Sequence, residues 1–267
     1  MQSEYWHRQA SDKPLFPDLL WSRPENRQVA GKLLIIGGNL HGFAAPAESF
    51  QAATKGGVGV ARVLLPESLQ KIVGSAFEAG EYAPSTPSGS FSQKALSEFL
   101  QMSQWADGVL LAGDLGRNSE TAILLEKLAE KYIGQLTITK DAADYFTSTP
   151  QKVSHRPDTL FVVSLAQLQK LGSSSGFARP FTFSMDFLHL IETLHEFTTV
   201  YAPNVIVKHL DTLFVAVDGE VSTTKLPEDK ETWRVETAAH AAVWWLQNPL
   251  KPFEALTTAV HDSVHNI

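Results

Sequence analysis

The residues of this sequence best placed to do chemistry surround a glycine-rich turn at residues 37–42. An apolar run at 33–36 predicts a short buried strand before the turn, and an alanine-rich segment at 44–55 predicts a helix after it. Glycines let the backbone approach a ligand closely, and the unpaired N–H groups and dipole at a helix N-terminus favour an anion. The spacing Gly-Gly-x-x-x-Gly is neither the dinucleotide-binding G-x-G-x-x-G nor a P-loop. The residues alone therefore leave two interpretations open, which are phosphate binding and tight packing of a strand against a helix.

Histidines and acids near the C-terminal half offer a second kind of chemistry, metal binding. One group lies in a segment with helical spacing of apolar residues, 184–197, but its order is not His-Glu-x-x-His. Imidazoles and carboxylates at these spacings usually mark a solvated helix face, so we expect no metal there. His261 and His265 lie one turn apart without an evident third ligand. The members of the first group are His189, Glu192, His195 and Glu196.

The elements that position these residues alternate along the chain. Apolar runs predict strands near residues 33, 60, 109, 136, 160 and 205, with helical segments between them. This order predicts an α/β fold whose sheet is doubly wound and mainly parallel. Asp218-Gly219 between two further runs, 213–217 and 220–223, predicts a β-hairpin. We expect helices at 44–55, 67–79, 93–102, 120–132, 184–197, 235–247 and 253–265, with Asn118 or Ser119 capping the fourth.

Length and composition limit the class of protein. Of 267 residues, 43% are hydrophobic and 19% charged, as in ordinary globular proteins, and we expect an N-terminal arm at 1–30 and a single domain at 31–267. The net charge of −7 argues against nucleic acid as a partner. No apolar run approaches the roughly 20 residues of a membrane helix. The chain has no cysteine, which excludes disulfides and thiolate zinc sites. We expect a cytoplasmic protein, compatible with a homo-oligomer.

The first strand–helix–strand unit carries a resemblance to a known family. The stretch G-G-N-L-H-G-F-A-A-P, followed by A-A-T-K-G-G-V-G-V-A-R-V, resembles the opening of the ADP/ATP-dependent NAD(P)H-hydrate dehydratases, a branch of the ribokinase-like superfamily. The resemblance extends over residues 27–266. It implies a three-layer α/β/α sandwich with a mainly parallel, doubly wound sheet and a C-terminal β-hairpin.

The same resemblance implies a set of site residues and ligands. The segment K-H-L-D-T matches the family's nucleotide-binding turn at Lys208 and Thr212. The implied cofactor is ADP or ATP with Mg²⁺, without a bound redox cofactor, and the implied partners are a nucleotide or hydrated NAD(P)H. The implied substrate-binding residues are Gly38, Asn39, Ala45 and Gly116.

The sequence departs from the family pattern where the family does its chemistry. Ala112 and Asp114 stand where the family has glycines, and we expect Asp114 to repel a phosphate-bearing ligand. The segment V-V-S-L-A at 162–166 replaces proline-histidine-proline-glycine-glutamate. W-R-V-E at 233–236 replaces glycine-threonine-glycine-aspartate, whose aspartate is the catalytic acid/base. Glu236 takes the aspartate's place in one alignment, and Ala239 takes it in another. Glu236 is also what an ordinary helix often has in its first turn, an acidic residue that favours the positive end of the helix dipole.

Three functions therefore follow from the sequence. The first, which we favour, is a diverged ribokinase-like protein whose catalysis is lost or altered and which still binds a nucleotide or serves as a structural or regulatory partner. The second is an active ADP/ATP-dependent NAD(P)H-hydrate dehydratase with Glu236 as its base. The third is a small-molecule kinase on the same scaffold, which would need the same glycine-rich anion site.

Overall fold

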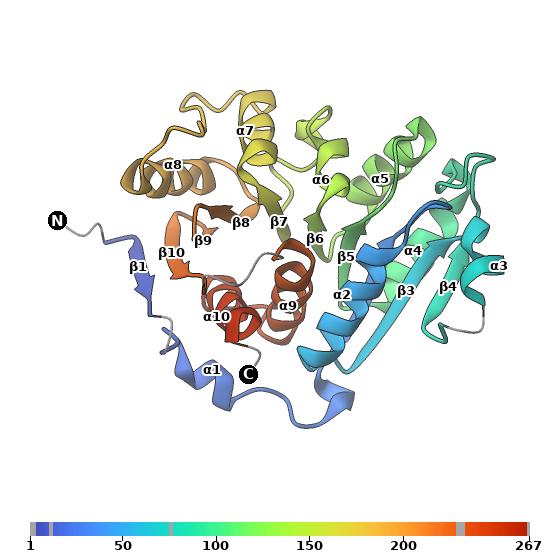
Figure 1. Ribbon diagram of the computed structural model, residues 1–267, viewed down its shortest axis with the longest axis horizontal. Helices are drawn as coiled ribbons and strands as arrows, with labels where there is room; N and C mark the ends of the chain where they lie inside the picture. The colour runs from blue at the N-terminus through green and yellow to red at the C-terminus, as the bar shows by residue number, and fades with distance from the viewer. Residues whose placement is uncertain (1–3, 11–12, 75–76, 228–232, 266–267) are drawn as a thin grey trace.

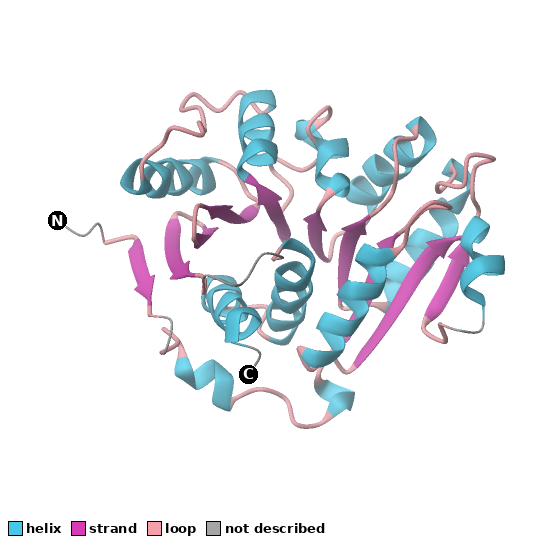
Figure 2. Cartoon of the chain, in the orientation of Figure 1, coloured by secondary structure: helices cyan, strands magenta, loops and turns pink. Residues whose placement is uncertain are grey.

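A single sheet of ten strands runs through the molecule (Figures 1 and 2). The computed structural model describes residues 4–10, 13–74, 77–227 and 233–265. The strand order is β1-β10-β9-β8-β7-β6-β5-β2-β3-β4. The strands are β1 (Trp6–Gln9), β2 (Lys32–Gly37), β3 (Val60–Pro66), β4 (Gly80–Ala83), β5 (Gly108–Gly113), β6 (Gln135–Thr139), β7 (Thr159–Ser164), β8 (Asn204–His209), β9 (Thr212–Val217) and β10 (Glu220–Lys225).

The sheet is mainly parallel, as the alternation of elements predicts. From β4 to β8 every neighbouring pair is parallel, and β9 runs antiparallel to both β8 and β10. The direction of winding reverses between β2 and β5, because the chain proceeds outward to β3 and β4 on one side and to β6, β7 and β8 on the other. In such sheets ligands bind outside the carboxyl ends of the strands, at this switch point.

Helices cover both faces of the sheet, which is why the central strands are apolar throughout. Leu34 and Ile36 of β2 pack into the core shared with α4, α5, α6, α7 and α8. Leu33 and Ile35 pack into the core shared with α2, α9 and α10. The helices are α1 (Pro17–Trp21), α2 (Ala44–Lys55), α3 (Gln70–Val73), α4 (Leu96–Trp105), α5 (Ser119–Lys131), α6 (Asp141–Phe146), α7 (Leu165–Ser174), α8 (Phe187–Val200), α9 (Arg234–Gln247) and α10 (Pro252–His265). Short 3-10 turns lie at Arg27–Val29, Glu67–Leu69, Gln93–Ala95 and Pro150–Lys152.

Most expected elements are confirmed. Helix α2 has the predicted bounds, and Asn118 caps α5 by accepting hydrogen bonds from the amides of Glu120 and Thr121. The hairpin of β9 and β10 turns at Asp218 and Gly219, whose φ angles of 47° and 85° suit the Asp-Gly turn. Within the described residues, no helix combines the length and apolar character that crossing a membrane requires.

The helix expected at residues 67–79 is wrong. A 3-10 turn and the four residues of α3 replace it, ending at Gly74 with a φ of 45°. The chain then forms β4, a strand that we did not predict, beside β3. The apolar spacing at 67–79 is satisfied by two buried residues, Leu69 and Val73, while Ile72 is exposed. This short helical segment is therefore enough to cover this part of the sheet.

The N-terminal segment adds an unpredicted strand to the sheet. Strand β1 pairs in parallel with β10 over Trp6–Gln9. The chain then runs along the outside of the molecule through α1 to reach β2 in the middle of the sheet (Figure 1). Gln9 is buried and donates hydrogen bonds to Thr224 Oγ1 at 2.9 Å and to the Thr257 carbonyl at 3.1 Å. This side chain ties the arm to β10 and α10.

Candidate functional site

The glycine-rich turn lies at the switch point between β2 and β5, where their carboxyl ends meet. The Gly38 amide donates to the Gly113 carbonyl at 3.0 Å, and both glycines have positive φ, 89° and 102°. A Cβ at Gly37 would lie 2.5 Å from the Gly113 carbonyl oxygen. Glycine is therefore required for these two turns to approach each other. This contact supports the packing interpretation of the turn without excluding a ligand beside it.

Asp114 fills the anion-binding position at the N-terminus of α2. Its Oδ2 accepts a hydrogen bond from the Ala45 amide at 2.7 Å, and its Oδ1 lies 2.9 Å from Lys140 Nζ. The Asn39 side-chain amide donates to the Asp114 carbonyl at 2.5 Å. Of the three residues that the resemblance implies for substrate binding here, Ala45 bonds the Asp114 carboxylate, Asn39 bonds the Asp114 carbonyl and Gly38 bonds the adjacent Gly113 carbonyl; their substrate-binding role stays a prediction. We expected Asp114 to repel a ligand; the structure adds that it occupies the helix end and pairs with a cation.

A second internal carboxylate, Asp141, occupies the turn after β5. The Gly116 amide donates to Asp141 Oδ2 at 3.2 Å. Burial raises the pKa of the Asp141 carboxyl and the nearby charge of Asp114 raises it further, against the lowering effect of backbone amides at 114–116. The Tyr145 hydroxyl donates to the Gly116 carbonyl at 2.5 Å and fixes the turn. Gly116, the fourth predicted substrate-binding residue, therefore serves an internal acid.

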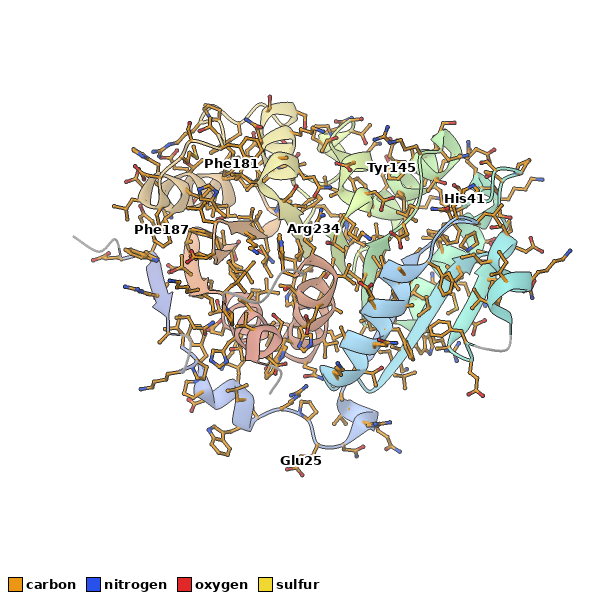
Figure 3. The ribbon with its side chains drawn as sticks, in the orientation of Figure 1. Glu25, His41, Tyr145, Phe181, Phe187 and Arg234 are labelled. Carbon is orange, nitrogen blue, oxygen red and sulfur yellow. The ribbon has the colours of Figure 1, made fainter. Side chains whose placement is uncertain are left out.

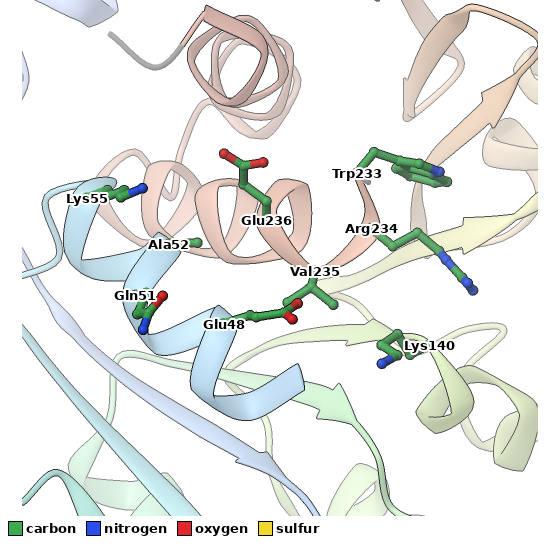
Figure 4. A pocket seen from close by; sticks show the side chains of 9 residues that line it. All are labelled: Glu48, Gln51, Ala52, Lys55, Lys140, Trp233, Arg234, Val235 and Glu236. Carbon is green, nitrogen blue, oxygen red and sulfur yellow. The ribbon is translucent and has the colours of Figure 1, made fainter. Parts of the chain in front are cut away.

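A pocket of about 490 Å³ opens beside this cluster, between α2 and the first turn of α9. Three cationic side chains line it, Lys55, Lys140 and Arg234, together with the acids Glu48 and Glu236. Arg234 and Lys140 lie at one end of the pocket, and Lys55 and Glu236 at the other (Figure 4). Lys140 links the pocket to the switch point, because it also pairs with Asp114.

The N-terminus of α9 carries bulky side chains where an anion-binding loop would need glycine. Trp233 is the N-cap residue and makes no side-chain capping hydrogen bond, and both Trp233 and Val235 line the pocket. Arg234 Nη1 donates to Gln167 Oε1 at 3.3 Å. Gln167 belongs to the capping box of α7, so Arg234 is held against the carboxyl end of β7. This helix end therefore presents the cationic side chain of Arg234 beside two bulky residues.

Glu236 lies in the first turn of α9, half-buried, and lines the pocket. The alternative alignment places Ala239 at the acid/base position, and Ala239 is fully buried in the core. Of the two positions, only Glu236 offers a carboxylate to a bound molecule. Its role as acid/base stays a prediction.

Lys208 and Thr212, the predicted nucleotide-binding residues, lie apart from this pocket. They flank the tight turn between β8 and β9, where Lys208 is in register with Ser164 of β7 and with Leu213. Neither residue lines the pocket beside α9. Lys208 is half-buried at the carboxyl edge, and its side chain makes no hydrogen bond or ion pair with the described residues. Thr212 lines a different cavity, on the face of the sheet that α8 covers. The nucleotide-binding role of both residues stays a prediction.

The histidine-containing group of α8 is a set of surface interactions. Arg179 bridges Glu192 and Glu196 at 2.9 and 2.6 Å. His189 contacts Asp186, the N-cap of α8, and His195 lies 2.6 Å from the Gly219 carbonyl. No group of three or more potential metal ligands occurs among the residues that the structure describes. His261 is buried in α10, and the side chain of His265 lies outside the described part.

Sequence reasoning missed the cations of the pocket. Lys140 follows β6 with a φ of 50°, a backbone conformation that lysine rarely adopts and that often marks functional sites. A signal was available for Lys140, because it is a lone cation at the end of an apolar strand run. No comparable signal exists for Lys55 and Arg234, which reach the pocket from helices on either side of it.

Comparison with known proteins supports the fold. No protein-family model matches the chain. A search of curated proteins finds no relative. Among solved structures, a ribokinase-like superfamily protein from Enterococcus faecalis V583 superposes on this chain with a TM-score of 0.72 at 15% sequence identity. The alignment covers 99% of this chain and 88% of the Enterococcus faecalis chain.

Two further structures share the architecture and have named activities. An ADP/ATP-dependent NAD(P)H-hydrate dehydratase from Bacillus subtilis, co-crystallised with ATP/Mg²⁺, gives a TM-score of 0.63 at 9% identity and covers 90% of this chain and 81% of its own. The pyridoxal kinase from Staphylococcus aureus in complex with AMP-PCP gives 0.53 at 15% identity, covering 85% and 84%. These likenesses, with the sheet order described above, show that this chain has the ribokinase-like α/β fold.

Proposed function

We propose that this chain is a diverged ribokinase-like protein that binds a phosphate-bearing nucleotide in the pocket between α2 and α9 and does not catalyse dehydration or phosphoryl transfer. The observation that carries the proposal is the Asp114 carboxylate, which sits on the Ala45 amide and pairs with Lys140. Catalysis of phosphoryl transfer depends on preorganised donors aimed at the developing charge. Here an amide at the N-terminus of α2 and the amide of Gly116 serve the chain's own acids.

The groups that remain suit binding of a phosphate. Arg234 carries a planar fork of donors that matches phosphate oxygens, and Lys55 adds a second cation without an ion pair among the described residues. The pocket volume of about 490 Å³ lies within the range of small-molecule sites. The Bacillus subtilis dehydratase structure was crystallised with ATP/Mg²⁺ and the pyridoxal kinase with AMP-PCP. ADP or ATP with Mg²⁺ is therefore the first ligand to test, and hydrated NAD(P)H the second.

One observation favours an active dehydratase as a second candidate. Glu236 lines the same pocket as the cations, in the first turn of α9, so a carboxylate lies beside a molecule bound there. A small-molecule kinase would use the same carboxylate. Both enzymes would have to stabilise phosphate charge through side chains instead of glycine-rich backbone.

The test combines binding with turnover. Calorimetry and thermal shift with ADP and ATP, each with Mg²⁺, should show binding; a ligand at about 100 times its dissociation constant stabilises the fold by about 2.7 kcal/mol. Arg234→Gln and Lys55→Gln should each weaken binding about tenfold. Lys71→Gln, which removes an exposed lysine outside the pocket, is the matched control and should bind like the wild type. Lys208→Ala tests whether the β8–β9 turn takes part.

Turnover of hydrated NADH separates the candidates. We expect no rate above the uncatalysed reaction for the wild type. A measurable rate that Glu236→Gln abolishes would establish the active dehydratase and refute the loss of catalysis. Absence of stabilisation by any nucleotide would refute the binding function.

A further inference from the structure

A second cavity, of about 480 Å³, lies on the opposite side of the sheet from α9. Its walls are β1, the adjoining parts of β9 and β10, and the first residue of α8, Phe187. Phe214 of β9 and Val221 of β10 belong to the core that α8 covers, which places the cavity on that face. Strand β1 supplies three of the eight lining residues, so the cavity depends on the pairing of Arg8 with Thr223 and of Trp6 with Val221.

Two aromatic rings form a fixed corner of this cavity. Trp6 and Phe187 meet edge to face, with ring centroids 5.6 Å apart, and Phe187 rests on Phe214 at 5.2 Å. The Trp6 indole N–H donates to Thr223 Oγ1 at 3.1 Å, which fixes the rotation of the ring. Phe187 is 37% exposed, although large aromatic side chains are usually buried. Figure 3 shows Phe187 near the N-terminal strand and Arg234 nearer the middle of the molecule.

The charged side chains of the cavity are cationic. Arg8 and Lys225 line it, and none of the described lining residues is acidic, on a chain whose net charge is −7. Lys225 lies 3.3 Å from Asp211 in an exposed pair, which stabilises little. Arg8 is exposed and makes no ion pair within the described part of the chain. A cationic guanidinium beside two aromatic rings suits a ligand that joins an anion to a flat ring.

We propose that this cavity binds a small aromatic anion, with its ring against Trp6 and Phe187 and its carboxylate or phosphate on Arg8 and Lys225. Thr212 lines the same cavity, and its hydroxyl donates to Asp211 Oδ1 at 3.1 Å. The proposal goes beyond the nucleotide function, because this cavity shares no lining residue with the pocket beside α9. It also gives the N-terminal strand a role in recognition in addition to covering the edge of β10.

The test uses naphthyl phosphate and naphthoate as probes in calorimetry at low ionic strength on the full chain. We expect dissociation constants below about 1 mM for both. Naphthol, which has the ring without the anion, and inorganic phosphate, which has the anion without the ring, should each bind at least tenfold more weakly. Arg8→Gln and Phe187→Leu should each weaken naphthyl phosphate about fivefold or more. Arg27→Gln removes an equally exposed arginine elsewhere and should leave binding unchanged.

The outcomes separate this site from the nucleotide site. Binding that is lost in Arg8→Gln and kept in Arg234→Gln supports the proposal, whether or not nucleotides bind. Binding that is lost in Arg234→Gln and kept in Arg8→Gln places the probe beside α9 and overturns the proposal, while leaving the nucleotide function intact. No saturable binding below about 10 mM also overturns it.

Discussion

Replacing Asp114 by asparagine tests whether an internal carboxylate stabilises the switch point. Asparagine tolerates the φ of 56° at this position and keeps an oxygen for the Ala45 amide, so the change removes the charge and the acceptor that faces Lys140. A negative charge at a helix N-terminus contributes about 0.5 kcal/mol. The ion pair with Lys140, whose partners are 20% and 30% exposed, contributes about 0.5 kcal/mol more. We expect a loss of about 1 kcal/mol, or about 2–4 °C in Tm for a domain of this size.

Urea-induced unfolding measures this loss, and a double-mutant cycle assigns it. Asp114→Asn combined with Lys140→Gln should show a coupling of about 0.5 kcal/mol that decreases with added salt. Asp218→Asn changes an exposed aspartate with a similar φ of 47° and should cost little, which controls for the backbone conformation.

The same variant has a consequence for ligands. Because Asp114→Asn releases Lys140, phosphate and ADP should bind several-fold more tightly than to the wild type. Unchanged stability together with unchanged phosphate affinity would refute the reasoning that Asp114 holds an anion position. A gain in stability would show that the Asp114 carboxylate does not stabilise the fold through the helix end and the ion pair with Lys140.

Three further predictions concern buried groups. Asp262 is fully buried, accepts a hydrogen bond from Trp244 Nε1 at 2.8 Å and lies 3.0 Å from His240 Nδ1. Asp262→Asn should therefore lower the free energy of unfolding, measured in urea, by about 3 kcal/mol. Burial raises the pKa of the Asp262 carboxyl, but these hydrogen bonds and the nearby charges lower it below its usual value. The stability that the ionised carboxylate contributes is therefore fully present above the unfolded pKa of about 3.9 and is lost as pH falls through the folded pKa. The Asp262→Asn variant should lack this pH dependence. Burial raises the pKa of Tyr132 to about 12, so stability should decrease as pH rises above 10, and absorbance titration should show a late ionisation that Tyr132→Phe removes. Gly59→Ala would place a Cβ 2.1 Å from the Arg27 carbonyl oxygen and should cost about 2 kcal/mol or more in thermal unfolding, whereas Gly42→Ala, with open space around it, should not.

The sequence by itself determined the central architecture of this protein. Strands buried on both faces appear as short apolar runs bounded by glycine or proline, and the six near residues 33, 60, 109, 136, 160 and 205 are all present. Local signals also placed α2, the cap of α5 and the Asp-Gly hairpin. The edge strands β1 and β4 were missed, because each is only four residues long and partly exposed. At the sheet edges, pairing with a neighbour decides the structure more than apolar pattern does.

The site depended on tertiary structure. Glycine spacing left anion binding and tight packing both open for the turn at residues 37–42, and the resemblance grouped Gly38, Asn39 and Ala45. The partners that fill this turn are far away in the chain: Asp114 reaches the Ala45 amide across 69 positions, and Lys140 reaches Asp114 across 26. Parallel strands bring their carboxyl ends to one edge of the sheet whatever their distance in sequence. Only the order of β2, β5 and β6 in the sheet therefore decided which carboxylate and which cation meet at this helix end.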